Sequence, residues 1–93
     1  MRFTWDNKKA VGNRKKHGIS FEETQTVFED REALLIYDPD NTKEEDRFLL
    51  LGVSLAVNVL VVCHCYRESD ELIRIISARK ATKTETSTYE RRK

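Results

Sequence analysis

The tripeptide Cys63-His64-Cys65 contains thiol and imidazole groups, the side chains that most often bind zinc. It lies in an apolar run that predicts a β-strand, so Cys63 and Cys65 point to one face, about 6.6 Å apart, and His64 points to the other. The three side chains cannot converge on one ion, and the spacing also disfavours a disulfide. We interpret the cysteines as small core residues and predict no metal site.

The two histidines, His17 and His64, are the side chains best suited to proton transfer near neutral pH. Each also has a structural interpretation. His17 precedes Gly18 at a predicted helix end, where a cation interacts favourably with the helix dipole. His64 suits a packed strand position with one hydrogen bond.

The arginines at strand ends are candidate phosphate ligands, because a guanidinium binds phosphate through two parallel hydrogen bonds. Arg67 ends one predicted strand, and Arg79 with Lys80 ends the next. Arg74 lies in the middle of that strand near Glu71, and we interpret it as an ion-pair partner. Several cations at strand ends can contact a single anionic ligand.

Other kinds of site are disfavoured by the sequence. The three glycines are isolated, so there is no glycine-rich phosphate loop. There is no His-Glu-x-x-His pattern and no serine in a nucleophile-elbow context. We therefore expect neither a nucleotide cofactor nor a catalytic metal.

The net charge of +1 conceals a strong segregation of charge along the chain. Residues 1–17 carry six Lys or Arg and one Asp, a net +5, and residues 67–93 carry eight Lys or Arg and five acids, a net +3. Residues 18–66 carry three Lys or Arg and ten acids, a net −7. If the fold brings the basic ends together, they form a surface suited to phosphates. The alternative is mutual neutralisation with the acidic middle.

The elements that must position these residues follow from capping signals and hydrophobic periodicity. A chain of 93 residues predicts one domain, 1–93. Asp6 and Ser20 are candidate helix N-caps, Gly18 suits a helix end, and Pro39 falls in a predicted turn. The expected order is strand 2–5, helix 7–16, a helix after Ser20, strands 33–37, 47–55, 57–66 and 72–79, and helix 81–93. This is an α+β fold with helices on one side of a small, twisted, mainly antiparallel sheet.

The location expected from the sequence is the cytoplasm. The first residues lack the apolar segment of a secretory signal, and no apolar run reaches the roughly 20 residues of a membrane span. Only two cysteines are present, which fits a reducing compartment. We expect no membrane partner.

Three blocks of the sequence resemble the BrnT toxin family. The first is Trp5-Asp6 with Lys9, Asn13 and residues 16–23, which read Lys-His-Gly-Ile-Ser-Phe-Glu-Glu. The second is Asp46-Arg47-Phe48 followed by Gly52, and the third is residues 74–82 with Glu85 and Tyr89. The similarity runs in register from Phe3 to Glu90, nearly the whole chain.

This resemblance implies a RelE-like fold, with a small sheet, two N-terminal helices and a C-terminal helix. It also implies a ribonuclease toxin of a type II toxin–antitoxin system that inhibits translation and growth. The partner would be a BrnA-type antitoxin, and operator DNA would be bound only through that antitoxin when the complex represses its own operon.

Metal-free RNA cleavage would then need an acid, a base and cations at one phosphate. His17 or His64 would transfer protons, and Arg67 and Arg79 would hold the phosphate. We expect further RNA contacts from Lys9, Lys16, Arg47, Tyr66 and Lys80. Two alternatives stay open: a non-catalytic, toxin-like protein that acts only in transcriptional regulation, and a small metal-sensing domain built on the cysteines.

Overall fold

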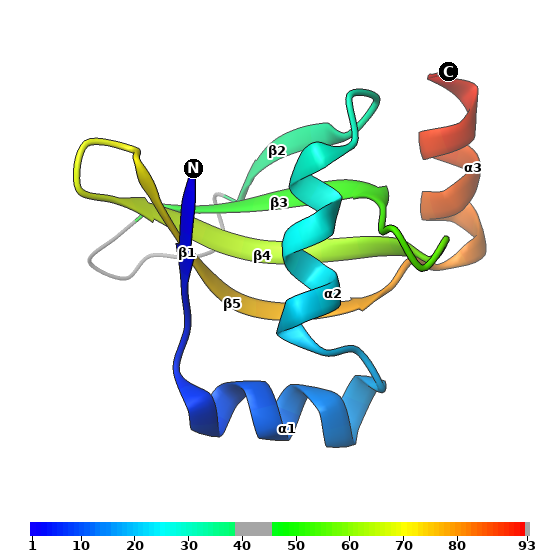
Figure 1. Ribbon diagram of the computed structural model, residues 1–93. Helices are drawn as coiled ribbons and strands as arrows, with labels where there is room; N and C mark the ends of the chain where they lie inside the picture. Colours follow the sequence, from blue (N-terminus) through cyan, green and yellow to red (C-terminus); the bar gives the residue numbers. More distant parts are fainter. Residues whose placement is uncertain (39–45, 93) are drawn as a thin grey trace.

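The chain forms a five-stranded sheet with helices on both faces (Figure 1). A computed structural model describes residues 1–38 and 46–92. The predicted turn at Pro39 therefore lies outside the described residues. The elements are β1 (Arg2–Thr4), α1 (Asn7–His17), α2 (Phe21–Gln25), the 3₁₀ helix η1 (Thr26–Glu29), β2 (Leu34–Asp38), β3 (Arg47–Val53), β4 (Val59–Arg67), β5 (Leu72–Lys80) and α3 (Lys83–Arg91).

The strands follow the order β1-β5-β4-β3-β2. Strands β2 to β5 form the antiparallel meander that their short connections predict. The sequence predicts the first strand but not its neighbour, and the structure places it parallel to β5 at the sheet edge. A β-bulge in β5 shifts the register between Cys63 and His64.

Helix α1 is bounded by the predicted caps and fixed to the sheet by one buried amide. Asp6 accepts a hydrogen bond from the Lys8 N–H, and Gly18 ends the helix with a φ of 73°, in the left-handed region. The Asn13 side chain donates to the carbonyls of Ile19 and Ala78 and accepts from the Ala78 N–H. From helix α1, the Asn13 side chain thereby satisfies the backbone N–H and carbonyl of Ala78 in β5.

Helix α2 begins at Ser20, whose hydroxyl accepts from the Glu23 N–H at 3.0 Å. Ser20 and Glu23 have the spacing of a capping box, but only this half of it forms. The Glu23 carboxylate instead accepts from Ser54 Oγ at 2.6 Å and from Asn58 Nδ2 at 2.8 Å. Glu23 therefore connects α2 to the β3–β4 turn.

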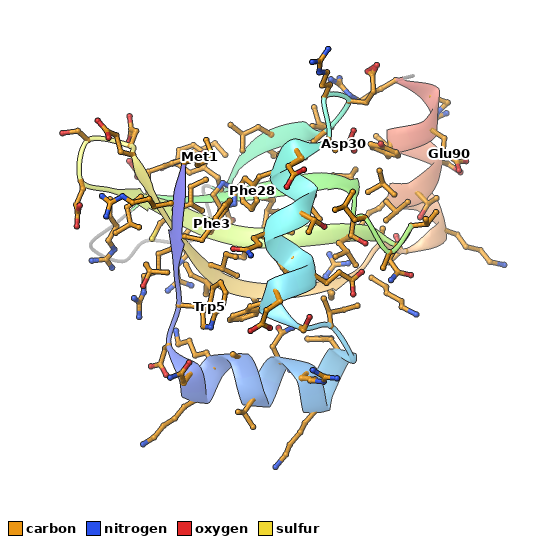
Figure 2. The ribbon with its side chains drawn as sticks, in the orientation of Figure 1. Met1, Phe3, Trp5, Phe28, Asp30 and Glu90 are labelled. Atoms are coloured by element: carbon orange, nitrogen blue, oxygen red, sulfur yellow. The ribbon has the colours of Figure 1, made fainter. Side chains whose placement is uncertain are left out.

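The main core lies between the sheet and the helices α1, α2 and η1. Ile19, Val27, Leu60 and Val62 form one buried cluster there, and aromatic rings close its edge. Phe3 of β1 and Phe28 of η1 lie side by side, with ring centroids 5.2 Å apart (Figure 2). The fold thus brings β1 and η1 together although they are distant in sequence.

Glycine is required at position 52, where η1 approaches β3 most closely. A Cβ atom there would lie 2.9 Å from Ala33 Cβ and 3.0 Å from Asp30 Oδ2 and Val27 Cγ1. These distances are shorter than ordinary contacts, so the absent side chain lets the helix pack directly on the strand.

Helix α3 packs on the opposite face of the sheet, against Leu51 and Val61, with Tyr89 in the contact. The expectation that all helices cover one side was wrong for this helix. Side chains alternate along a strand, and the apolar runs of β3 and β4 have apolar residues on both faces, so each face requires cover. The Tyr89 hydroxyl donates to Asp30 Oδ2 at 2.6 Å. This hydrogen bond connects α3 to the end of η1, just before β2.

Membrane-spanning helices are not found among the described residues, where no helix is both long and apolar enough to cross a bilayer.

Candidate nucleic-acid interface

Arg47 and Arg74 lie on the sheet face opposite α2 and η1, one on each side of Cys65. Cys65 is the cross-strand partner of Arg74. Arg47 precedes Phe48, which pairs with His64, so Arg47 comes next to Cys65 on the same face. The three central strands therefore present two guanidinium groups in one row, beyond the area that α3 covers.

Lys9 adds a positive charge from helix α1, which the hydrogen bonds between Asn13 and Ala78 hold at the edge of β5. The positive charges of Arg47 and Lys9 lower the pKa of the Cys63 thiol, whereas the charges of Asp38 and Cys65 raise it. Burial is the largest influence, and the net result is a raised pKa. The Cys63 thiol therefore stays protonated at neutral pH.

Arg67 occupies the next row of the same face, at the end of β4 opposite Leu72. It is a diagonal neighbour of Arg74 across the β4–β5 pair. We call the surface formed by Lys9, Arg47, Arg67 and Arg74 the cationic face. The side chains of Cys65, which is buried, and Cys63, which is half-buried, lie beneath it.

Two arginines of the cationic face have hydrogen-bond donors without a partner among the described residues. The guanidinium of Arg74 has no ion pair or hydrogen bond within the described residues. The Nε atom of Arg47 is buried and has no hydrogen-bond partner in the same part of the chain. Guanidinium groups without carboxylate partners are available to phosphate oxygens.

His64 and Tyr66 lie on the other face of the sheet, beneath η1. His64 is fully buried, and its Nε2 lies 3.2 Å from the Tyr66 hydroxyl. Burial lowers the pKa of His64, which favours the neutral imidazole. The predicted proton-transfer role of His64 would have required it to share a face with Arg67, and the bulge in β5 does not bring it there.

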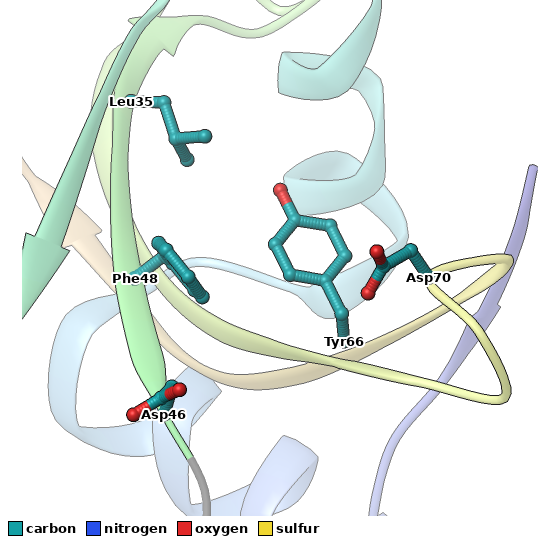
Figure 3. Close-up of a pocket in the computed structure, with 5 residues that line it drawn as sticks. All are labelled: Leu35, Asp46, Phe48, Tyr66 and Asp70. Atoms are coloured by element: carbon teal, nitrogen blue, oxygen red, sulfur yellow. The ribbon is translucent and has the colours of Figure 1, made fainter.

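Tyr66 also lines an open pocket of about 450 Å³ with Leu35, Asp46, Phe48 and Asp70 (Figure 3). The rings of Phe48 and Tyr66 meet edge to face at 5.3 Å. Burial, followed by the charge of Asp70, raises the pKa of Tyr66. We call this the aromatic–acidic pocket, and its carboxylates make it unsuited to a phosphate.

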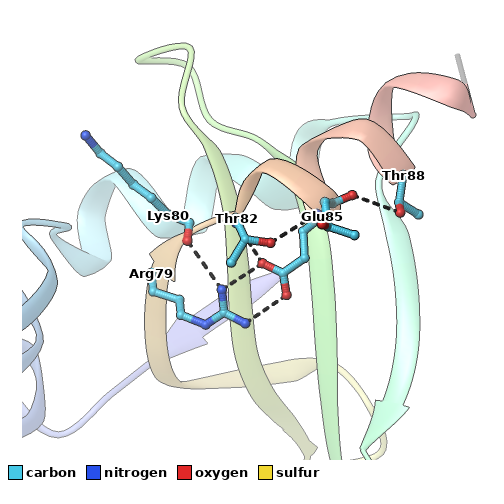
Figure 4. Close-up of polar contacts among 6 residues, drawn as sticks. Arg79, Lys80, Thr82, Glu85 and Thr88 are labelled. Atoms are coloured by element: carbon cyan, nitrogen blue, oxygen red, sulfur yellow. Dashed lines mark hydrogen bonds and ion pairs between the residues drawn. The ribbon is translucent and has the colours of Figure 1, made fainter.

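Arg79 lies on the same face as the cationic residues but is engaged by α3 (Figure 4). Its two terminal nitrogens donate to the two oxygens of Glu85 at 2.8 and 2.9 Å. This hydrogen bonding to Arg79, with that to the Thr82 backbone, lowers the pKa of Glu85 from 4.5 to about 2. The predicted phosphate ligand is therefore already paired with a carboxylate.

Arg79 and Arg67 do not meet. Arg79 is opposite Val61, and Arg67 ends the same strand six residues later, about 20 Å away at the rise of a β-strand. One phosphate cannot contact both side chains. Two further residues that were predicted to contact RNA are exposed. Lys16 lies on the last turn of α1, and Lys80 ends β5 next to Arg79.

His17 lies one helical turn beyond Asn13, which holds α1 against Ala78 of β5. It is half-buried at the same end of the molecule as Arg79. Of the predicted site residues, the structure therefore groups Lys9, Arg47 and Arg67 on the cationic face. It places His64 and Tyr66 on the opposite face.

Arg74 is the member of the cationic face that the sequence interpretation missed. Its position in mid-strand near Glu71 suggested an ion pair, and none is found for it among residues 1–38 and 46–92. The available signal was strand alternation. A hairpin through residues 68–71 places Arg74 across from Cys65, on the face that Arg67 also occupies.

Residues 5–85 match the sequence profile of a family described as the ribonuclease toxin BrnT of type II toxin–antitoxin systems. The crystal structure of the Brucella abortus ribonuclease toxin BrnT is similar to this chain, with a TM-score of 0.67 and 24% sequence identity. The similarity covers 89% of this chain and 99% of the Brucella chain. It shows that the two share an α+β fold. No protein with a curated description matches the chain by sequence.

Proposed function

The chain belongs to the BrnT family of ribonuclease toxins of type II toxin–antitoxin systems, and we propose that it cleaves RNA on its cationic face. The observation that carries the proposal is the pair of arginines, Arg47 and Arg74, that flank Cys65 on one face of the sheet. The Arg74 guanidinium has no carboxylate partner among the described residues. Lys9 and Arg67 extend the same surface.

The chemistry we propose is attack of a ribose 2′ oxygen on its own 3′ phosphorus. The new P–O2′ bond forms as the P–O5′ bond breaks, leaving a 2′,3′-cyclic phosphate and a 5′-hydroxyl end. Negative charge builds up on the non-bridging phosphate oxygens during this step. Arg74 and Arg47 would stabilise that charge through hydrogen bonds placed before the reaction begins.

The proton transfers fall to groups other than arginine, which stays protonated in proteins. Lys9 carries an ammonium group on this face, and we propose that it protonates the departing 5′ oxygen. The 2′ proton passes to water. His64 is buried and neutral on the opposite face, so we assign it a packing role.

The proposed reaction uses no metal ion or cofactor, because each role is filled by the cationic side chains, Lys9 and water. We further propose that a BrnA-type antitoxin neutralises the toxin in the cytoplasm, and that the complex represses its own operon. Operator DNA would then be contacted only by the antitoxin. The family's membership in type II systems supports a protein antitoxin.

The test is RNA cleavage by the purified chain with Arg74→Ala, measured in the presence of a metal chelator. We expect the rate to fall by about 10²-fold or more, as for other preorganised charge-stabilising groups. The matched control is Arg31→Ala, which removes an exposed arginine from the turn before β2. Cleavage at the parent rate by folded Arg74→Ala protein would refute the assignment.

The competing function is that of a toxin-like protein that binds its antitoxin without cleaving RNA. Absence of cleavage by the parent chain, together with intact antitoxin binding and operator repression, would establish that alternative. Cleavage that stops on addition of the chelator would instead refute the metal-free mechanism.

A further inference from the structure

Strand β2 forms an open edge of the sheet with apolar side chains on both of its faces. It is the last strand in the order and pairs only with β3 among the described strands. Leu35, Ile36 and Tyr37 are consecutive and are 49%, 42% and 50% exposed. An exposed edge with unpaired backbone groups and apolar side chains is a template for another strand.

On the α3 side of the sheet, β2 borders an apolar groove. Leu34 and Ile36 of β2 line it with Leu49, Val61 and Thr88, and the groove has a volume of about 210 Å³. Alternate residues of an added strand would point into this groove, next to Ile36. Apolar side chains at those positions would fill it.

On the opposite side, β2 borders the aromatic–acidic pocket, where Leu35 forms one wall. Figure 3 shows Phe48 and Tyr66 between the carboxylates of Asp46 and Asp70. Neither carboxylate has an ion-pair partner within residues 1–38 and 46–92. Asp46 Oδ1 accepts a hydrogen bond from the Tyr37 hydroxyl of β2 at 3.1 Å. Aromatic faces beside carboxylates that lack a cationic partner attract a lysine or arginine side chain.

We propose that β2 is the docking edge for the antitoxin, which adds an extended segment to the sheet as a sixth strand. The segment would carry apolar residues facing the groove and a lysine or arginine facing Asp46 and Asp70. Backbone hydrogen bonds would supply affinity, and the two unlike pockets would fix the register. The proposal rests on the family's protein antitoxin but not on RNA cleavage.

A second copy of this chain fits the edge less well because acids flank both ends of β2. Asp30 and Glu32 precede the strand, Asp38 is its last residue, and Asp46 precedes β3. Pairing two copies in either direction brings acids of one chain toward acids of the other, which is unfavourable. A partner with basic residues relieves that repulsion.

The first experiment measures binding of the protein encoded next to this chain to the parent chain and to two variants. Ile36→Arg places a charge at the groove and should raise the Kd by about tenfold or more. The matched control, Leu55→Arg, alters an equally apolar residue that is 73% exposed in the β3–β4 turn, and it should leave the Kd unchanged.

The second experiment tests the charge of the pocket. Asp70→Asn keeps a side chain that tolerates the φ of 69° at this position, and it should weaken binding several-fold at low salt and less at high salt. Glu90→Gln makes the same charge change on α3 and should have no effect.

A third measurement is amide hydrogen exchange in the parent complex. Exchange at residues 35–37 should slow when the antitoxin binds.

The outcomes separate this proposal from the proposed function. Unchanged affinity of Ile36→Arg, or unprotected amides at residues 35–37 in the complex, would overturn β2 as the docking edge. Dimerisation of the isolated chain that Ile36→Arg abolishes would assign the edge to a second copy and also overturn it. RNA cleavage is read separately, since Ile36→Arg should cleave at the parent rate in the absence of antitoxin.

Discussion

Arg74 and Arg79 lie on the same strand and differ in what neutralises them. Arg79 is paired with both oxygens of Glu85, while Arg74 lies beyond the part of the sheet that α3 covers. A guanidinium that already binds a carboxylate must release it before it can bind phosphate. The environment of each arginine thus ranks Arg74 above Arg79 as a phosphate ligand.

Arg79→Ala should leave the protein folded and lower the cleavage rate less than Arg74→Ala does. The Arg79–Glu85 pair has side chains 41% and 32% exposed, so its loss should cost no more than about 1 kcal/mol. The measurements are RNA cleavage and urea unfolding of both variants. Complete loss of cleavage in folded Arg79→Ala protein would restore Arg79 as the main phosphate ligand.

The two cysteines should be dispensable for cleavage. They lie beneath the cationic face with a raised Cys63 pKa, so neither is prepared to act as a nucleophile. Replacing both with Ala or Val should retain RNA cleavage and cost at most a few kcal/mol of stability. Stoichiometric zinc in the purified parent chain, or loss of cleavage in the folded double variant, would contradict this prediction.

At the scale of elements, α3 is held to the sheet by a small number of defined contacts. Thr82 and Glu85 form a capping box at its start, and Tyr89 donates to Asp30 near its end. Burial and the Asp30 hydrogen bond raise the pKa of Tyr89 to about 12, so the hydroxyl keeps its proton over the ordinary pH range. Threonines weaken this helix intrinsically, and the cap and the tertiary contacts compensate.

The Glu85 contribution to stability should disappear in acid. Its pKa is about 2 in the folded chain and 4.5 ordinarily, so the unfolded chain binds the proton more readily between these values. Glu85→Gln should therefore lower the free energy of unfolding by about 1 kcal/mol at neutral pH. That difference should shrink as the pH falls from 4.5 towards 2.

Urea unfolding of parent and Glu85→Gln chains at several pH values measures this difference. Glu90→Gln, an exposed acid on the same helix, serves as the control and should show no such trend. A difference that is constant down to pH 2 would show that the Arg79–Glu85 pair contributes nothing through charge.

At the scale of the whole molecule, the fold assembles cations from separate parts of the sequence. Lys9 comes from the basic N-terminal segment, Arg67 and Arg74 come from the basic C-terminal segment, and Arg47 comes from the acidic middle. Acids of the middle segment flank β2 instead. The segregation of charge along the chain thus becomes a separation of surfaces.

RNA affinity should fall steeply with salt because binding releases counterions. Each phosphate neutralised on a single strand contributes roughly 0.7 to the slope, so four cations predict a slope of log K against log salt of about −3. Arg74→Ala should make the slope shallower by about 0.7, whereas Arg31→Ala should not change it. Salt-independent RNA binding would exclude the cationic face as the binding surface.

Much of the fold was predictable from local signals. The caps at Asp6, Ser20 and Gly18 mark helix ends through hydrogen bonds made within a few residues, and the structure confirms them. The antiparallel meander followed from short connections between apolar runs. The family motifs likewise predicted the BrnT family, which the match over residues 5–85 confirms.

The sequence by itself thus determined the elements, their order and the family, because these depend on residues close together in the chain. Only the tertiary structure decided that α3 covers the second face, that Glu23 binds the β3–β4 turn, and that Arg79 pairs with Glu85 while Arg74 has no such partner in the described part of the chain. Each of these depends on a sheet register or on a contact between distant segments. The bulge in β5 shows why, since one extra residue resets which side chains beyond it share a face.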